Sequence, residues 1–160
     1  MRKVSLLLLL AAALGSCKKD NETTPATASK ADMLAAKSWR VSAASSTYTI
    51  NGVPLVTNEY ASMTACEKDD FTKFNANKTA TFDQGASKCD PSDPQSRSGT
   101  WELTANDAKL NIYDPGQGSI AIPFDIISMS ATTLQVRNTY SYSANGISAT
   151  QTTDVTYTAF

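Results

Sequence analysis

The sequence lacks histidine altogether: none occurs among its 160 residues. This absence excludes Ser-His-Asp and Cys-His nucleophilic centres, and it removes the most common metal ligand. Any enzyme built on this chain would have to use carboxylate, lysine, tyrosine or serine groups alone. We therefore expect a protein that is not an enzyme and that carries no cofactor.

An excess of charge of one sign is lacking as well. The chain has 14 basic and 15 acidic residues, which gives a net charge of −1 at neutral pH. Nucleic-acid-binding surfaces need a basic excess, so we expect no nucleic-acid partner. Long apolar runs are also scarce, because no segment after the first 14 residues approaches the roughly 20 apolar residues that span a bilayer.

The one apolar run lies near the start of the sequence. Arg2 and Lys3 precede an apolar stretch from Leu6 to Leu14, and the small residues Gly15 and Ser16 follow it. A charged start, an apolar middle and small residues before a cleavage point are typical of an export signal. An ordinary secretory signal is one explanation of this pattern.

The segment Leu14-Gly15-Ser16-Cys17 resembles the lipobox of bacterial lipoproteins. That resemblance implies a signal peptide over residues 1–16, cleavage before Cys17, and attachment of acyl chains such as palmitate to Cys17. Two or more acyl chains make a stable anchor. The expected location is therefore the outer membrane, on its periplasmic face or at the cell surface, with the membrane as a partner through Cys17. Residues 17–30 have too few large apolar side chains to fold and are expected to form a flexible tether.

Residues 31–160 are long enough for one folded domain with a single core. Near its start, apolar residues at helical spacing predict one short helix over Ala31–Lys37, capped by Ser29 or Asp32. After Trp39 the apolar pattern changes to a period of two, with turn signals about every ten residues, which is typical of an antiparallel barrel or sandwich. The predicted fold class is all-β, with eight or nine antiparallel strands joined in sequence by hairpins.

Turn residues set the expected strand limits. Asn51-Gly52 and Asn145-Gly146 are strong hairpin signals, Pro54 favours an edge position for its strand, and Asn58–Cys66 is interpreted as a loop or one helical turn. We expect the hairpin from Tyr140 to Thr156 to project past the barrel. The expected strands are Trp39–Ile50, Val53–Thr57, Asp70–Phe74, Thr79–Asp83, Ser96–Thr104, Lys109–Tyr113, Ile120–Ile127, Leu134–Ser143 and Ile147–Phe160.

Two cysteines remain once Cys17 is assigned to the anchor. Cys66 and Cys89 flank the hairpin around residues 75–78 at similar distances, so antiparallel arms would bring them together at its open end. In an oxidising compartment such a pair is interpreted as a disulfide. Two buried thiols are the alternative.

Several segments resemble a known family. Gly99-Thr100-Trp101 has the Gly-x-Trp form found in lipocalins, and Lys37-Ser38-Trp39 opens the first strand in a similar way without the glycine. The segments Ala65–Asn75 and Gly85–Pro94 resemble the lipocalin-like lipoprotein domains of Bacteroidetes. The resemblance extends over about residues 34–136 and implies an up-and-down lipocalin-like β-barrel more than it implies an activity.

Inward-facing positions follow from the period of two. An eight-stranded barrel either is filled by its side chains or holds one small ligand, and the pattern leaves both open, although an aromatic residue on an alternating strand is more often core. Further positions with the same facing are Leu110, Ile122, Leu134, Val136 and Val155. The candidates for the interior and for contact with any ligand are Trp39, Phe74, Phe82, Trp101, Leu103, Ile112, Phe124 and Tyr157.

An acidic cluster surrounds the two cysteines. Asx turns and loop solubility are the ordinary explanation of such residues, calcium binding is a second, and glycoside hydrolysis by paired carboxylates is a third. We assign no metal site; the candidates for calcium would be Asp69, Asp70, Asp90 and Asp93.

Tyr140 and Tyr142 share one strand face, where packing in the core or at the barrel mouth is the ordinary explanation and stacking on a sugar or a protein partner is the alternative.

Three functions remain compatible with these features. The first is non-catalytic binding of a small apolar or amphiphilic molecule in the barrel mouth. The second is a structural or interaction lipoprotein with a filled barrel that binds a protein or glycan through its loops. The third is inhibition of an exported hydrolase by the same loops.

Overall fold

A computed structural model describes residues 28–117 and 120–160. The predicted signal peptide, Cys17 and nearly all of the predicted tether lie outside the described residues. Over the described ranges, no helix is both long enough and apolar enough to cross a membrane.

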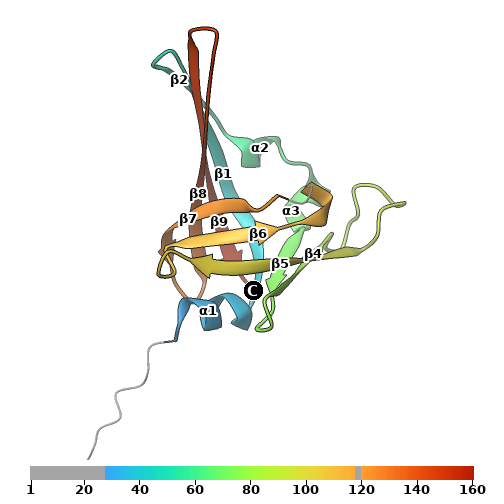
Figure 1. The fold of residues 1–160 in the computed structure, drawn as a ribbon. Coiled ribbons are helices and arrows are strands. Elements are labelled where there is room, and N and C mark those ends of the chain that lie inside the picture. Colours follow the sequence, from blue (N-terminus) through green and yellow to red (C-terminus); the bar gives the residue numbers. More distant parts are fainter. Residues whose placement is uncertain (1–27, 118–119) are drawn as a thin grey trace, which may run out of the picture.

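Nine strands and a few short helices make up the described chain (Figure 1). In chain order they are α1 (Lys30–Ala36), β1 (Ser38–Ile50), β2 (Val53–Thr57), α2 (Glu59–Ser62), α3 (Ala65–Asp69), β3 (Phe71–Phe74), β4 (Thr79–Asp83), β5 (Ser96–Thr104), β6 (Lys109–Tyr113), η1 (Pro115–Gln117), β7 (Ile122–Met129), β8 (Thr133–Ala144) and β9 (Ile147–Ala159).

The strands form one antiparallel sheet in the order β2-β1-β3-β4-β5-β6-β7-β8-β9, and β1 also pairs with β9. That pairing closes β1 and β3–β9 into an eight-stranded barrel and leaves β2 as an extra strand beside β1. Successive barrel strands are neighbours, so the topology is up-and-down and the predicted all-β class is confirmed.

Two short helices and the limits of β7 differ from the expectation by more than one residue. Asn58 and Thr64 each cap a helix, because each side-chain oxygen accepts from the backbone N–H group three residues on. The chain between β2 and β3 therefore forms α2 and α3, where the sequence indicated a loop or a single turn. β7 begins at Ile122, which pairs with Ile112 of β6, and not at Ile120, which lies in a bend and is exposed.

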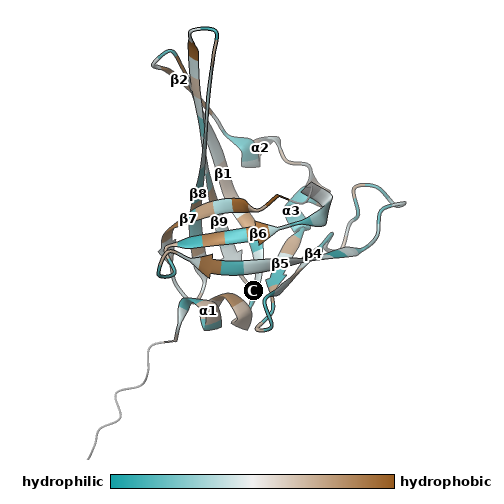
Figure 2. Cartoon of the chain, in the orientation of Figure 1, coloured by the Kyte–Doolittle hydropathy of each residue, from teal (hydrophilic) through white to brown (hydrophobic). Residues whose placement is uncertain are grey.

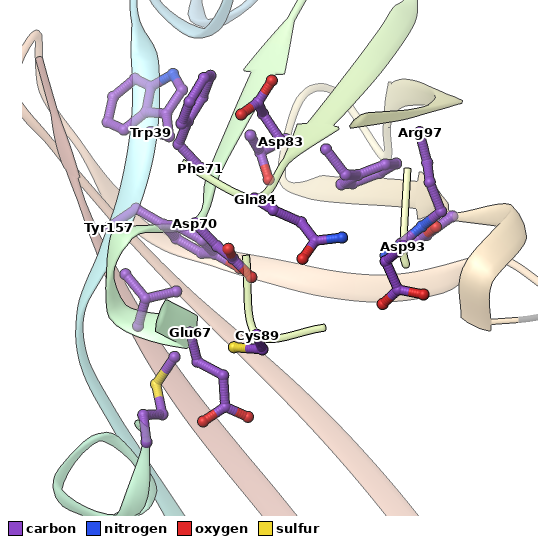
Figure 3. A pocket seen from close by; sticks show the side chains of 15 residues that line it. Trp39, Glu67, Asp70, Phe71, Asp83, Gln84, Cys89, Asp93, Arg97 and Tyr157 are labelled. Atoms are coloured by element: carbon purple, nitrogen blue, oxygen red, sulfur yellow. The ribbon is translucent and has the colours of Figure 1, made fainter. Parts of the chain in front are cut away.

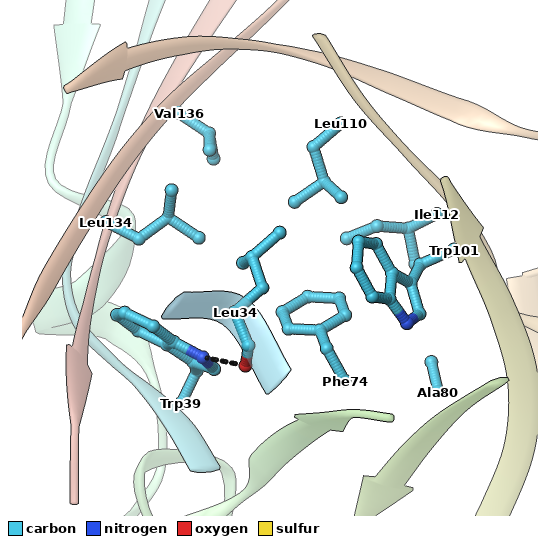
Figure 4. Close-up of a cluster of buried hydrophobic side chains, with 9 residues drawn as sticks. All are labelled: Leu34, Trp39, Phe74, Ala80, Trp101, Leu110, Ile112, Leu134 and Val136. Carbon is cyan, nitrogen blue, oxygen red and sulfur yellow. Dashed lines mark hydrogen bonds between the residues drawn. The ribbon is translucent and has the colours of Figure 1, made fainter. Parts of the chain in front are cut away.

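The helix α1 closes one end of the barrel. Ser29 caps it in a capping box with Asp32, and Leu34 inserts its fully buried side chain into the barrel. Trp39 donates from its Nε1 to the carbonyl oxygen of Leu34 at 2.9 Å (Figure 4). The helix thus becomes a plug that is fixed to the first strand.

The buried core lies next to this plug (Figure 4). Phe74 and Trp101 meet edge to face with ring centroids 5.5 Å apart, and the indole N–H of Trp101 donates to the carbonyl of Asn75 at 3.0 Å. Gly99 has no room for a side chain, because a Cβ there would lie 2.0 Å from the carbonyl oxygen of Tyr113. The core residues are Leu34, Trp39, Phe74, Ala80, Trp101, Leu110, Ile112, Leu134 and Val136.

Three strands continue past the barrel. β3 pairs with β1 only at Ser38 and Trp39, whereas β9 pairs with β1 as far as Ile50 and β8 pairs with β9 along its whole length. With β2, these extensions make a four-stranded sheet, here called the blade, of residues 46–57 and 138–153, which projects from the end of the barrel away from α1 (Figure 1). The predicted projection of the β8–β9 hairpin is confirmed.

Candidate functional site

A cavity of about 460 Å³ opens at the end of the barrel away from α1, here called the mouth (Figure 3). Its floor comes from the inward faces of β1 and β9, through Trp39, Val41 and Tyr157, and from Phe71 and Phe82 at the ends of β3 and β4. Trp39 also belongs to the buried core, so it separates the packed half of the barrel from the cavity.

The floor is apolar and uncharged. Tyr157 lies opposite Val41 on one side and Leu134 on the other. Burial raises the pKa of the Tyr157 hydroxyl to about 12, so this group is neutral at physiological pH. The floor therefore suits the apolar part of a ligand.

The wall of the cavity is acidic. Glu67, Asp70, Asp83, Asp93 and Asp114 all border it. Burial is the main cause that raises the pKa of Asp70, and the nearby carboxylates of Asp69 and Glu67 add to it. Within the described residues, the buried Oδ1 atom of Asp70 has no hydrogen-bond partner. A buried acceptor without a partner favours a donor supplied by a ligand or by water.

One guanidinium balances part of this charge. Arg97 of β5 lies 3.4 Å from Asp114, which directly follows β6. Asp114 is 8% exposed and also accepts from the backbone N–H of Gly116 at 2.8 Å. A Cβ at Gly116 would lie 2.7 Å from the Nε of Arg97, so the glycine allows this chain to pass against the guanidinium. Four carboxylates besides Asp114 remain along the wall.

The wall is held in place by covalent and polar links. Cys66 in α3 and Cys89 in the loop between β4 and β5 form a disulfide, with their Cα atoms 5.2 Å apart. The carboxylate of Asp69 accepts from the backbone N–H groups of Ala86 and Ser87 at 3.1 and 3.0 Å. The predicted disulfide is confirmed, and it fastens this loop to α3 at the edge of the cavity.

The candidate interior residues divide into two groups. The core buries Trp39, Phe74, Trp101 and Ile112. The other four are partly buried and pack against the core; they are Phe82, Leu103, Phe124 and Tyr157. Three of the eight line the cavity: Trp39, Phe82 and Tyr157.

The four calcium candidates do not act together. Asp69 holds the loop as described, and Asp90 accepts from the N–H and hydroxyl of Ser92 in an Asx turn. Those hydrogen bonds lower the pKa of Asp90. Asp70 and Asp93 border the cavity. Across residues 28–117 and 120–160, no group of three or more acidic or cysteine side chains is arranged to hold a metal ion.

Sequence reasoning missed several lining residues. Val41 lies two positions from Trp39, so strict alternation could have found it. Phe71 lies three positions before Phe74 and breaks the period of two. Arg97 and Asp114 are 17 positions apart and meet only because β5 and β6 are paired.

The barrel and its cavity define a class of protein: a small antiparallel β-barrel with a ligand-sized hollow at one end. The lipocalin-like domain family matches residues 36–136, and the chain belongs to that family. The β8–β9 part of the blade lies beyond the matched residues. Comparison with curated proteins and with solved structures gives no match.

Proposed function

We propose that this chain is a lipid-anchored, non-catalytic binding protein that takes one small amphiphilic molecule in the mouth cavity. The observation that carries the proposal is the cavity itself, with an aromatic floor beneath an acidic wall. Its volume of about 460 Å³ falls within the range of small-molecule pockets, about 300–1,000 Å³. The lipocalin-like fold supports binding, although a fold alone is a weak argument for function.

The lining narrows the chemistry of the ligand. Trp39, Phe71, Phe82 and Tyr157 offer aromatic contact to an apolar body. The surplus of carboxylates over the single Arg97 guanidinium favours a head group that is positively charged or rich in hydrogen-bond donors. An amphiphile with an amine head fits both parts of the cavity better than a purely apolar molecule or an anionic one.

The packed half of the barrel limits how deep such a ligand can lie. Leu34, Phe74 and Trp101 occupy the end that α1 closes, so only the mouth half can accept a molecule. The second candidate function, an interaction protein with a filled barrel, is favoured by this packing and by the exposed side chains of the blade.

The membrane anchor is part of the proposal and rests on Leu14-Gly15-Ser16-Cys17. We infer acylation at Cys17 and attachment to the outer membrane, at its periplasmic face or at the cell surface. Radiolabelled palmitate should label the chain in a bacterial host with lipoprotein processing, and Cys17→Ser should abolish the label. Equal labelling of both chains would refute the anchor and leave the cavity proposal standing.

Two probes of equal chain length test the ligand. We expect dodecylammonium, added below its micellar concentration, to bind at least about tenfold more tightly than dodecanoate, a difference of about 1.4 kcal/mol. Trp39 borders the cavity, so intrinsic tryptophan fluorescence is the readout. Native mass spectrometry of the chain purified from its own host should show a co-purifying amphiphile.

Matched variants locate the binding. The pair Asp70→Asn and Asp93→Asn should remove most of the preference for the ammonium probe, because both carboxylates border the cavity. Asp107→Asn is the control, since Asp107 lies in the turn at the α1 end, where its carbonyl accepts from Lys30. Equal affinity for the two probes, or an equal loss in all variants, would refute an amine-binding mouth.

A further inference from the structure

Among the described strands, both outer edges of the blade, β2 and β8, lack a paired neighbour, and the β8 edge is the less protected of the two. On its outer side β8 pairs with β7 only from Leu134 to Arg137, while on its inner side it pairs with β9 as far as Ala144. The five residues Thr139–Ser143 therefore present an outer edge that no described strand covers. All five are exposed.

Sheet edges are normally protected against pairing with another chain by charges, prolines or bulges. The other edge of the blade, β2, carries Pro54, which lacks a donor and suits an edge. The β8 edge has no such protection. Neither segment of the blade, 46–57 or 138–153, contains a single acidic or basic residue.

The sequence of this edge is nearly symmetrical. Thr139-Tyr140-Ser141-Tyr142-Ser143 gives the same order of side-chain types in both directions about Ser141. Tyr140 and Tyr142 lie on one face of the sheet, beside Gln151 and Ala149 of β9, and the hydroxyl residues lie on the other. A strand with this symmetry matches itself when it is turned around.

We propose that the Thr139–Ser143 edge is an interface for a second copy of this chain, paired antiparallel about a twofold axis at Ser141. In this register Tyr140 lies opposite Tyr142 of the second copy, and Thr139 lies opposite Ser143 of the second copy. Aromatic pairs and hydroxyl pairs are both favourable across strands. The two blades then form one continuous sheet.

The missing charge explains why the occupant is a second copy. About a twofold axis, Ser141 lies opposite Ser141 of the second copy, and the residues next to it lie opposite one another. A charge near the axis would therefore lie close to the same charge of the second copy. Like charges directly opposite one another destabilise a strand pair. An edge free of charge over its whole length avoids that repulsion.

The antiparallel arrangement also leaves space for both barrels. Each barrel lies at the lower end of its own β8 (Figure 1), so an antiparallel pair places the two barrels at opposite ends of the joined sheet. The exposed tyrosines of both copies then lie on the same face. The edge offers five residues from each copy, against the roughly 20–30 residues a side of a standard stable interface, so we expect the dimer to be transient in dilute solution.

Disulfide trapping tests a transient pair. In the full chain, Ser141→Cys sets two thiols opposite each other at the axis, within the Cα separation that a disulfide needs, because paired residues of antiparallel strands lie about 4.5–5.5 Å apart. Val56→Cys is the matched control, since Val56 is 67% exposed and lies on the opposite edge of the same blade. The unsubstituted chain shows what Cys17 contributes.

We expect mild oxidation to give a covalent dimer of the Ser141→Cys chain at least about tenfold faster than of the Val56→Cys chain or of the unsubstituted chain. Adding Tyr140→Glu to Ser141→Cys sets charges beside the axis and should reduce the rate to that of the control. Equal rates for the two cysteine positions, faster trapping at position 56, or no effect of Tyr140→Glu would each overturn the proposal.

Discussion

The packed end of the barrel and the blade share three strands, β1, β8 and β9, and differ in burial. At the packed end, the inward row of β1 and β8 includes Trp39 and Leu134, which are fully buried. Farther along the same rows, Ile50 is 55% exposed and Tyr140 is 64% exposed. The blade part of this face is more polar, because it also holds Ser46 of β1 and Gln151 and Thr153 of β9, and Figure 2 shows mostly hydrophilic to neutral colours in the blade with a hydrophobic patch at its tip. The exposed apolar side chains of the blade lie where β3–β7 do not cover the row.

This difference assigns stability to the packed end, and binding of ligands and partners to the mouth and the blade. The packed end gains its free energy of folding from buried apolar area. The mouth and the blade leave polar and apolar groups uncovered, which is where ligands and partners bind. The following predictions test whether stability and recognition are separated in this way.

The largest contrast should come from two aromatic truncations. Trp101→Ala removes a side chain that is 1% exposed and should cost about 3–5 kcal/mol of unfolding free energy. Tyr140→Ala removes an exposed ring of the blade and should change stability by no more than about 0.5 kcal/mol. Guanidinium denaturation followed by circular dichroism measures both, and similar losses would show that the blade contributes to the core.

The disulfide should rank second. Cys66 and Cys89 are 23 positions apart, and the chain-entropy relation gives about 3 kcal/mol for a loop of this length. The pair of changes Cys66→Ser and Cys89→Ser should lower the denaturation midpoint and speed hydrogen exchange in α3 and in the β4–β5 loop. Hydrogen exchange in α1 should speed up only by the amount that the lower global stability accounts for. A selective loss of protection in α1 would contradict the separation of the two ends.

Two capping boxes give a finer comparison. Ser29→Ala should cost about 1 kcal/mol, because α1 holds the buried Leu34 in the barrel. Thr64→Ala removes the equivalent cap of α3, which contains no buried residue, and should cost less in thermal melts of the same protein. The reverse ranking would mean that the mouth, and not the plug, limits stability.

Local rules predicted most of the barrel. Asn51-Gly52 and Asn145-Gly146 both adopt positive φ angles, as their hairpin turns require, and the two confirmed hairpins set the register of the long strands. The Gly-x-Trp motif needs glycine at position 99, because the backbone of Tyr113 occupies the space that a side chain there would fill. The first motif has Lys37 at the corresponding position, where the backbone is extended.

The cavity could not be predicted in the same way. Its lining joins α3, the β4–β5 loop and the ends of five strands, so it depends on contacts between residues distant in the sequence. The acidic residues were recognised, but their division into loop supports such as Asp69 and cavity walls such as Asp70 depends on tertiary structure. The projection of the β8–β9 hairpin was predicted, but packing of Tyr140 and Tyr142 in the core or at the barrel mouth was wrong, because both are exposed. A period of two is the same whether or not a second wall covers the strand.

The smallest expected effect concerns the acidic wall. Because burial raises the pKa of Asp70, the folded state binds a proton at this carboxyl more readily than the unfolded state, and ionisation destabilises the fold as pH rises through the folded pKa. Asp70→Asn removes that cost, so Tm should rise by about 1–2 °C at neutral pH, with solvent screening limiting the gain. The gain should vanish below the ordinary Asp pKa of 3.8.

Asp90→Asn should show the opposite sign in the same melts. Hydrogen bonds from Ser92 lower the pKa of Asp90, so its ionised form stabilises the fold at pH values above the ordinary Asp pKa. A gain for Asp70→Asn that does not depend on pH would mean that shape, and not charge, makes the mouth less stable than the packed end.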